Sequence, residues 1–426
     1  MHIVVRHDAD VPDDDLDRNT PPAQEPPARP QGGSSGDEPA AVPGATTPPV
    51  LGEAGWAAAP VEPGLGAAAP VPVERPSARA MTLSISMLAS AVLLAAVAVL
   101  PAPYTVSGPG PTEDVLGEVD DKPLITIEGA STYDSTGELR LTTVSATGGP
   151  GYPSSTLRVL RGWFSPWSVV QPREILFPDA DRTQDEIDQE NSAQMVSSQE
   201  NASVAALTEL GYEVPATLVI AGTVEGSGAD GKFEDGDVLT AIDGTALPDY
   251  LSLITTMDGV TPGDDVTVTV RRHGEDVDVV VPTTKGDDGR AQMGVYIDPD
   301  FDMPVDITIE AGRIGGPSAG TMFALGIIDL MTPQDEAAGQ VIAGTGTIDV
   351  TGAVGPIGGI RQKLAGAARD GATWFLAPAA NCGEVVDHVP DGLRVVRVET
   401  LHEAYEDVVA IGEGKADDLP TCETAA

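Results

Sequence analysis

The sequence predicts an α+β protein with a single transmembrane helix, a β-rich domain and a C-terminal α+β domain. Three observations support this fold class. Residues 82–100 form an uncharged apolar stretch. Residues 214–284 carry short β-branched runs between glycine turns, and residues 305–380 alternate strand-like and helix-like patterns. A chain of 426 residues has room for about two to four such units.

Acidic side chains dominate the composition. The chain has 66 Asp and Glu residues against 23 Lys and Arg residues, which gives a formal net charge of -43. Binding to nucleic acid requires a basic face for the phosphates, so no nucleic acid partner is predicted. Hydrophobic residues make up 41% of the chain and aromatic residues 4%, so its cores must be mainly aliphatic.

No metal or cofactor is predicted. The five histidines and two cysteines are scattered, and neither an HExxH nor a CxxC pattern occurs. The GxxxxGK[ST] pattern is also absent, so the sequence gives no sign of an ATP-driven motor. A catalytic mechanism would therefore rely on ordinary side chains.

Residues 1–80 are rich in Pro, Ala, Gly and Asp and poor in large apolar residues. Such a segment buries too little surface to offset its ordering entropy, so it is predicted to be a disordered tail. A Pro-rich docking tail is the alternative interpretation.

Residues 81–101 are predicted to be a transmembrane helix. The stretch 82–100 contains no charge and no proline, and at about 1.5 Å per residue it spans roughly 29 Å. Arg75 and Arg79 precede it, so the positive-inside rule places the N-terminus in the cytoplasm and the C-terminal domains outside. A buried core helix and a cleaved signal peptide are the alternatives, and a retained single-pass anchor in the cell membrane is favoured.

Residues 102–212 are predicted to contain a β-hairpin and a helix. Strand patterns on either side of Gly137 suggest the hairpin. A capping-box pattern at Thr183 and Glu186 opens a helix over residues 183–210. The aromatic cluster of Trp163, Phe164 and Trp167 either packs on the domain, which is favoured, or lies at the membrane interface.

Residues 213–286 form the predicted β-rich module. Its glycines suit tight turns, in the segments Gly231–Lys232, Gly236–Leu239 and Ile242–Gly244. With these motifs the segment resembles a bacterial PDZ domain.

A PDZ domain binds an extended peptide by adding it to a sheet edge. The resemblance implies that the peptide-binding strand includes Thr217, Leu218, Val219 and Ile220. A clear Gly-aliphatic loop is missing there, and a PDZ fold that serves only as a spacer is the alternative.

A serine lies at the start of a predicted helix in the C-terminal domain. Gly315–Gly320 reads GGPSAG, and an apolar stretch over residues 321–330 follows. Pro317 suits a first helical position, so Ser318 is expected beside the unsatisfied amides and positive dipole end of this helix. Those amides could stabilise an oxyanion. A phosphate or carboxylate site at the helix end is the competing interpretation.

A lysine opens a second predicted helix. Lys363 is one of five lysines and is followed by Leu364, Ala365, Ala367 and Ala368. Partial burial among apolar residues lowers the pKa of a lysine, which could then accept a proton from a serine hydroxyl near neutral pH.

These motifs together resemble the proteolytic domain of Lon-type serine proteases. The resemblance rests on GPSAG at residues 316–320, TGTIDVTG at 345–352 and PIGGIRQK at 356–363. It covers residues 290–412, with 413–426 as a C-terminal tail. With the anchor and the PDZ-like module, the architecture resembles the membrane-anchored PDZ–Lon (YlbL-type) family of Gram-positive bacteria.

The resemblance implies a Ser-Lys dyad. Ser318 would be the nucleophile and Lys363 the general base, and Thr345 would help to hold the lysine. The flanking residues Gly316, Pro317, Ala319 and Gly320 would support the site. One departure is Thr347, which stands where many Lon enzymes have an acidic residue. Taken separately, Ser318 could be a helix cap and Lys363 a solvated residue.

The implied function is an ATP-independent serine endopeptidase that cleaves extracytoplasmic proteins or peptides. Its PDZ module would recruit a substrate or partner. Lon peptidase domains often assemble as rings, so a homo-oligomer is possible, but the sequence does not give the oligomeric state. The competing hypothesis is a non-catalytic scaffold at the cell surface.

The placement outside the cell bears on the two cysteines. In an oxidising compartment Cys382 and Cys422 could pair and tie the C-terminal tail to the last domain. Two unpaired thiols are the equal alternative.

Overall fold

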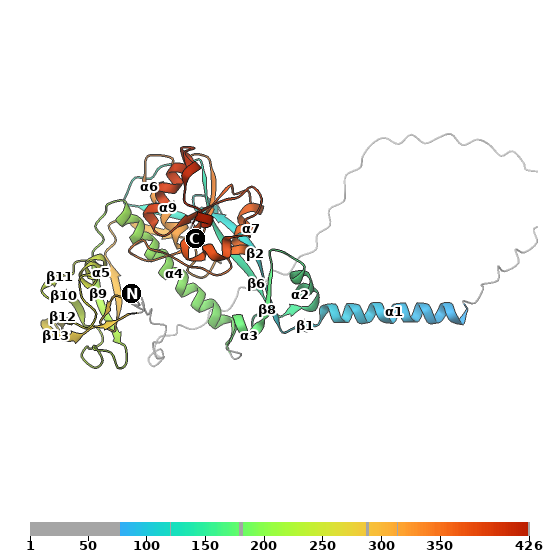
Figure 1. Ribbon diagram of the computed structural model, residues 1–426, viewed down its shortest axis with the longest axis horizontal. Coiled ribbons are helices and arrows are strands. Elements are labelled where there is room, and N and C mark those ends of the chain that lie inside the picture. Colours follow the sequence, from blue (N-terminus) through green and yellow to red (C-terminus); the bar gives the residue numbers. More distant parts are fainter. Residues whose placement is uncertain (1–76, 120, 179–181, 287–288, 313, 425–426) are drawn as a thin grey trace, which may run out of the picture. The chain divides into compact units, whose positions relative to one another are not determined.

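The computed structural model describes residues 77–119, 121–178, 182–286, 289–312 and 314–424 (Figure 1). Helices and strands are mixed throughout this part of the chain, which confirms the α+β class. The predicted disordered tail, residues 1–80, lies outside the described residues except for its last four.

Helix α1 (Ala78–Val99) is the predicted apolar helix. It begins three residues before the predicted start, and none of its side chains is buried. Its 22 residues span about 33 Å at about 1.5 Å per residue. The helix is therefore long and apolar enough to cross a bilayer.

One of two six-stranded sheets in the described residues is mixed and has the order β22-β21-β18-β6-β2-β8. Strands β6, β18, β21 and β22 run parallel to one another, whereas β2 is antiparallel to both β6 and β8. Its strands are β2 (Tyr104–Asp114), β6 (Glu138–Thr147), β8 (Val169–Pro172), β18 (Val341–Gly344), β21 (Trp374–Pro378) and β22 (Arg394–Val398).

The predicted hairpin in residues 102–212 is wrong. Strand β5 (Ile125–Glu128) pairs with β17 (Asp306–Ile309), while β6 pairs with β2 and β18. Local alternation identified both strands, but it did not reveal that β5 pairs with β17 and β6 with β18, because those two partners lie far away in the sequence.

The six-stranded sheet also crosses the predicted domain boundary at residue 290. Strands β2, β6 and β8 precede the PDZ-like module, and β18, β21 and β22 follow it. Val341 is opposite Glu138 in the register. The module is therefore inserted between two parts of one fold, and residues 290–412 alone lack half of the strands in that sheet.

Helices next to this sheet carry the core. Helix α6 (Gly320–Met331) is apolar on all sides and almost entirely buried. Helix α7 (Ile360–Arg369) is buried except at Arg361, Ala368 and Arg369, and α9 (Leu401–Gly412) packs against α6. The long helix α4 (Gln184–Glu209) opens with the predicted capping box of Thr183 and Glu186.

A second sheet forms the PDZ-like module, with the order β13-β12-β10-β9-β16. Its core is aliphatic and includes Leu218, Ile220, Leu239 and Ile242. The bounds are β9 (Ala216–Thr223), β10 (Val238–Ile242), β11 (Thr245–Ala246), β12 (Asp265–Arg272), β13 (Glu275–Pro282) and β16 (Val295–Phe301), with helix α5 (Tyr250–Asp258).

Short elements complete the described chain. The remaining two-stranded pairs are β1 (Pro101–Ala102) with β7 (Ser154–Ser155), β3 (Glu118–Val119) with β4 (Lys122–Pro123), β14 (Thr284–Lys285) with β15 (Ala291–Gln292), and β19 (Thr347–Ile348) with β20 (Val354–Gly355). The short helices are α2 (Thr156–Trp163), α3 (Arg173–Leu176), α8 (Cys382–Val385), η1 (Ala379–Asn381), η2 (Ala416–Asp418) and η3 (Cys422–Thr424).

A disulfide joins the C-terminal segment to the last domain. Cys382 and Cys422 are bonded, with their Cα atoms 4.9 Å apart. The sequence left open whether these cysteines pair or stay as free thiols, and in the structure they are paired. The segment after α9 is thereby tied to α8.

Candidate active site

Ser318 lies in a tight turn just before helix α6. The helix begins at Gly320, with Ala319 as its N-cap, so Pro317 is not the first helical residue as predicted. Gly316 has a φ of +85°, a left-handed conformation that favours glycine, and the chain turns there before it reaches the helix. We call residues 315–319 the serine loop.

Lys363 reaches the serine from the first turn of α7. Its Nζ donates hydrogen bonds to Ser318 Oγ at 2.7 Å and to Thr345 Oγ1 at 2.8 Å. The side chain is only 2% exposed. Burial destabilises the charged amine and lowers the pKa of Lys363 from 10.5 to about 7.

Thr345 bridges the lysine and the serine loop. Its hydroxyl accepts from Lys363 Nζ and donates to the Ser318 carbonyl at 2.9 Å, and the residue is fully buried. The amide of Gly346 donates to the same carbonyl at 2.9 Å. The segment after β18 therefore fixes both the lysine amine and the backbone of the serine.

Helix α4 holds the serine loop from the other side. Ser198 Oγ donates to the Pro317 carbonyl at 3.1 Å, and the Gly316 amide donates to the Asn191 carbonyl at 2.9 Å. Ser198 is buried. Sequence reasoning missed these contacts because α4 lies about 120 residues before the loop, and neither residue belongs to a recognisable motif.

Gly320 is needed for this close packing. A Cβ atom there would lie 2.7 Å from Ile348 Cγ2 and 2.9 Å from Ser198 Oγ. Both distances are shorter than normal contacts, so a side chain would push the loop away from α4 or β19. Of the predicted supporting residues, Gly316 and Gly320 shape the loop, Ala319 caps α6, and Pro317 presents its carbonyl to α4.

Ser318 and Lys363 open onto a cleft of about 410 Å³. One wall is the serine loop with Ile314, and the other is formed by residues 142–145 of β6. Strand β18 pairs with β6 only from Glu138 to Leu141. The cleft-lining part of β6 therefore extends beyond its pairing with β18.

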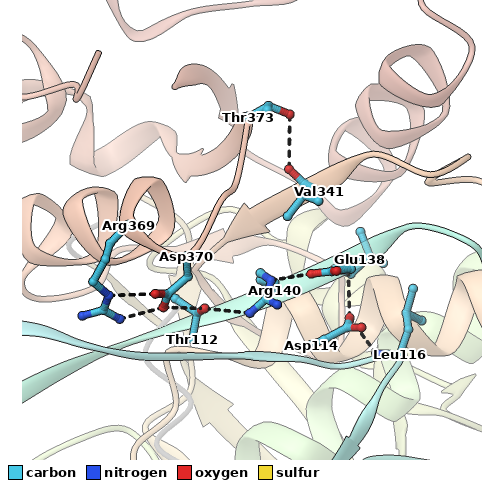
Figure 2. A network of polar contacts seen from close by, with 10 residues as sticks. Thr112, Asp114, Leu116, Glu138, Arg140, Val341, Arg369, Asp370 and Thr373 are labelled. Atoms are coloured by element: carbon cyan, nitrogen blue, oxygen red, sulfur yellow. Dashed lines mark hydrogen bonds and ion pairs between the residues drawn. The ribbon is translucent and has the colours of Figure 1, made fainter. Parts of the chain in front are cut away.

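A polar network fixes the far end of α7, as Figure 2 shows. Thr112 Oγ1 donates to Asp370 Oδ2 at 2.9 Å and accepts from Arg140 Nη1 at 3.0 Å. Arg369 Nη2 donates to the Gly110 carbonyl at 2.9 Å. The helix that carries Lys363 is thus attached to β2 and β6.

The predicted peptide-binding strand is not a sheet edge, which corrects that prediction. Thr217, Leu218, Val219 and Ile220 lie in β9, which pairs with β10 on one side and with β16 on the other. Leu218 and Ile220 are buried in the core. The edge to which a PDZ ligand would add is covered by β16, a strand from beyond the predicted module.

The histidines considered as alternative bases have other contacts. His402 Nδ1 lies 2.6 Å from Glu209 Oε1, and this carboxylate raises the pKa of the ring. His388 Nδ1 contacts the Val386 carbonyl. Within the described ranges, no three His, Cys, Asp or Glu side chains are grouped so that they could hold a metal ion.

Comparison with known families identifies two domains. Residues 291–411 match the Lon protease (S16) C-terminal proteolytic domain, and residues 194–283 match the PDZ domain. The PDZ match begins within α4. The chain therefore carries a Lon-type proteolytic domain and a PDZ domain.

Individual relatives are similar over part of the chain. Lon protease 1 of Bacillus subtilis is 35% identical over 126 residues, which are 28% of this chain and 16% of that protein. The mitochondrial Lon protease homolog of Bos taurus is 35% identical over 107 residues, 24% of this chain and 11% of that protein. The matched stretch is thus less than a fifth of the length of these relatives.

A solved PDZ domain of an SdrC-like protein from Listeria innocua is 20% identical. The match covers 19% of this chain and 92% of that chain, with a TM-score of 0.18.

Proposed function

We propose that this chain, with its Lon-type proteolytic domain and PDZ domain, is a membrane-anchored serine endopeptidase that acts through Ser318 and Lys363. The observation that carries the proposal is the 2.7 Å contact between Lys363 Nζ and Ser318 Oγ in a buried site. A lysine with a pKa of about 7 is present partly as the neutral amine at physiological pH, and only that form can accept a proton.

In the acylation step, neutral Lys363 takes the hydroxyl proton of Ser318 while Oγ attacks the scissile carbonyl. The proton moves from Ser318 Oγ to Lys363 Nζ along the hydrogen bond that joins these atoms. Thr345 holds the amine in place, and its other hydrogen bond keeps the serine backbone still. The resulting ammonium delivers its proton to the leaving amine, and an acyl-enzyme on Ser318 remains.

The turn before α6 stabilises the negative charge that develops on the carbonyl oxygen of the substrate. The amides of Ser318, Ala319 and Gly320 lie at the N-terminus of this helix, where the helix dipole favours negative charge. They are the candidates for stabilising the oxyanion. In deacylation Lys363 activates a water molecule in the same way and returns its proton to Ser318.

The cleft suits an extended polypeptide. Residues 142–145 of β6 line it opposite the serine loop and lie beyond the pairing with β18. A substrate segment can lie beside this strand with its scissile bond at Ser318. Because the sequence shows no nucleotide-binding motor motif, we propose ATP-independent cleavage of flexible protein segments.

Helix α1 supports anchoring in the cell membrane, with Arg75 and Arg79 on its cytoplasmic side and the domains outside. The Cys382–Cys422 disulfide supports the same placement, because such bonds persist in oxidising compartments. Because β9 has a paired strand on each side, we do not assign peptide recruitment to it. Assembly as a homo-oligomer stays a prediction.

The test is cleavage of fluorescein-labelled casein by the full chain in detergent or nanodiscs. Ser318→Ala and Lys363→Ala should each abolish cleavage, because the first removes the nucleophile and the second removes the base. Ser192→Ala, an exposed serine on α4, is the matched control and should be fully active. Unchanged cleavage by both site variants would overturn the dyad and favour the non-catalytic scaffold.

A further inference from the structure

We infer that helix α2 and the residue after it dock on the surface of the bilayer that α1 spans. The docking surface consists of Leu157, Leu160, Trp163 and Phe164, flanked by Arg158 and Arg161, and we call it the α2 patch. The inference rests on the proposed membrane anchor and adds a second, interfacial contact with lipid.

The α2 patch is apolar and exposed. Leu157 and Leu160 are each 42% exposed, Trp163 is 58% exposed and Phe164 is 87% exposed. The opposite side of the helix is packed: Val159 is buried, and a Cβ atom on Gly162 would lie 2.6 Å from Val170 Cγ2. Helix α2 therefore has apolar residues on two sides, and only one of them is covered in the described part of the chain.

The α2 patch begins where the transmembrane helix ends. Both the amide and the hydroxyl of Thr156, the first residue of α2, donate to the Leu100 carbonyl at 3.0 Å. Strand β1, which directly follows α1, pairs with β7, which directly precedes α2. Hydrogen bonds thus hold the start of α2 against the residue next to the end of α1, at the level where lipid headgroups begin.

The charge around α2 differs from the rest of this acidic protein. Residues 141–173 contain three arginines, Arg158, Arg161 and Arg173, and no aspartate or glutamate, in a chain with 66 acidic residues. Arg158 and Arg161 are exposed on α2 itself. Anionic headgroups attract such arginines, whereas an acidic surface would be repelled from the membrane.

The types of side chain also fit a lipid interface. Tryptophan is enriched at this depth, and arginine can extend its head toward the phosphates while its stem stays in apolar surroundings. Trp163 packs edge-on against Tyr104, with ring centroids 5.8 Å apart, so its position relative to the sheet is defined. A short amphipathic helix with these residues is typical of segments that lie in the plane of the interface.

The experiment uses the full chain in nanodiscs of phosphatidylcholine and phosphatidylglycerol. The probe is phosphatidylcholine brominated near the top of its acyl chains, which quenches tryptophans at the interface. All proteins in this experiment carry Trp167→Phe, because Trp167 belongs to the same aromatic cluster as Trp163. In this background we expect Trp163→Phe to remove most of the quenchable emission. Trp374→Phe, which replaces a buried tryptophan of the peptidase sheet, should leave the quenchable emission unchanged.

A second pair of variants tests the charge. Arg158→Glu together with Arg161→Glu should reduce quenching of Trp163 in discs that contain phosphatidylglycerol. Leu160→Ser together with Phe164→Ser should reduce it in both lipid mixtures. Retained quenching in the Trp163→Phe variant, or no loss with either pair, would overturn the inference.

The outcomes separate this inference from the proposed function. A chain that does not enter nanodiscs overturns the anchor and the docking together. A chain that enters them, with Trp163 unquenched, overturns only the docking. Casein cleavage in detergent should be the same for the α2 patch variants and the wild type, so a failure of the Ser-Lys dyad is detected independently.

Discussion

The proton-accepting role that we propose for Lys363 predicts a specific pH dependence of proteolysis. Burial lowers the pKa of Lys363 from 10.5 to about 7. At pH 7 about half of the lysine is then neutral, against roughly three molecules in ten thousand for an unperturbed lysine. Burial therefore increases the amount of active base by about a thousandfold, equivalent to about 4 kcal/mol.

The assay is the initial rate of cleavage of labelled casein at low concentration, which follows kcat/KM. With a pKa of about 7, the neutral fraction rises about tenfold between pH 6 and pH 8 and then levels off. Lys363→Arg should be inactive across this range, because a guanidinium does not lose its proton. His402→Gln should keep the wild-type profile, since its ring contacts Glu209 and not Ser318.

The same burial has a consequence for stability. The folded pKa of this base lies below its unfolded value, so the unfolded state binds more protons between about pH 7 and pH 10.5. Stability should rise with pH in that window, by about 2 kcal/mol from pH 7 to pH 9. Lys363→Met should lack this increase in the free energy of unfolding, as measured by urea unfolding.

The cleavage assay can refute the proposed role of Lys363 as the base. A cleavage rate that continues to rise beyond pH 9, in a stably folded enzyme, would contradict a base with a pKa of about 7.

Three further predictions concern a residue that contacts the serine loop, a buried carboxyl group and the disulfide. Ser198→Ala removes the hydrogen bond to the serine loop and should lower kcat about fivefold with little change in KM, whereas Ser192→Ala should have no effect. Burial raises the pKa of Asp407 to about 7. Between about pH 4 and pH 7 the folded state therefore binds more protons than the unfolded state, and the free energy of unfolding falls as pH rises through this range. Asp407→Asn should therefore stabilise the protein by about 2 kcal/mol at pH 8 but not below pH 4, as measured by urea unfolding. Replacing Cys382 and Cys422 by alanine should lower the free energy of unfolding by about 3 kcal/mol. Dithiothreitol should then leave the unfolding temperature of this variant unchanged in calorimetry.

The local parts of the candidate site could be picked out from the sequence because each part lies in a short motif. Ser318 and Lys363 lie in separate glycine-rich segments, and the structure brings their side chains together with Thr345. The capping box at Thr183 was also predictable, since its two partners are three residues apart. To predict helix α1, only the length and the hydropathy of its apolar stretch were needed.

Long-range pairing could not be predicted in the same way. Strand β6 was recognised, but nothing in its alternation indicates a parallel partner at residues 341–344. Strand β16 covers β9 although it lies outside the segment with PDZ motifs. The contact of Ser198 with Pro317 depends on how α4 packs, and a lone serine in an acidic helix carries no signal of that role.

The divided peptidase sheet has a consequence for how the protein matures. Strands β2 and β6 are made early, but β6 receives its partner β18 only after the whole PDZ domain has been synthesised. Pairing across about 200 residues is slow, because a long loop must close before the contacts form. Ser318 and Lys363 also lie on the late side of the insertion. A nascent chain that ends before the PDZ domain therefore has an incomplete sheet and lacks both Ser318 and Lys363, so the candidate site can form only after the last strands have been synthesised.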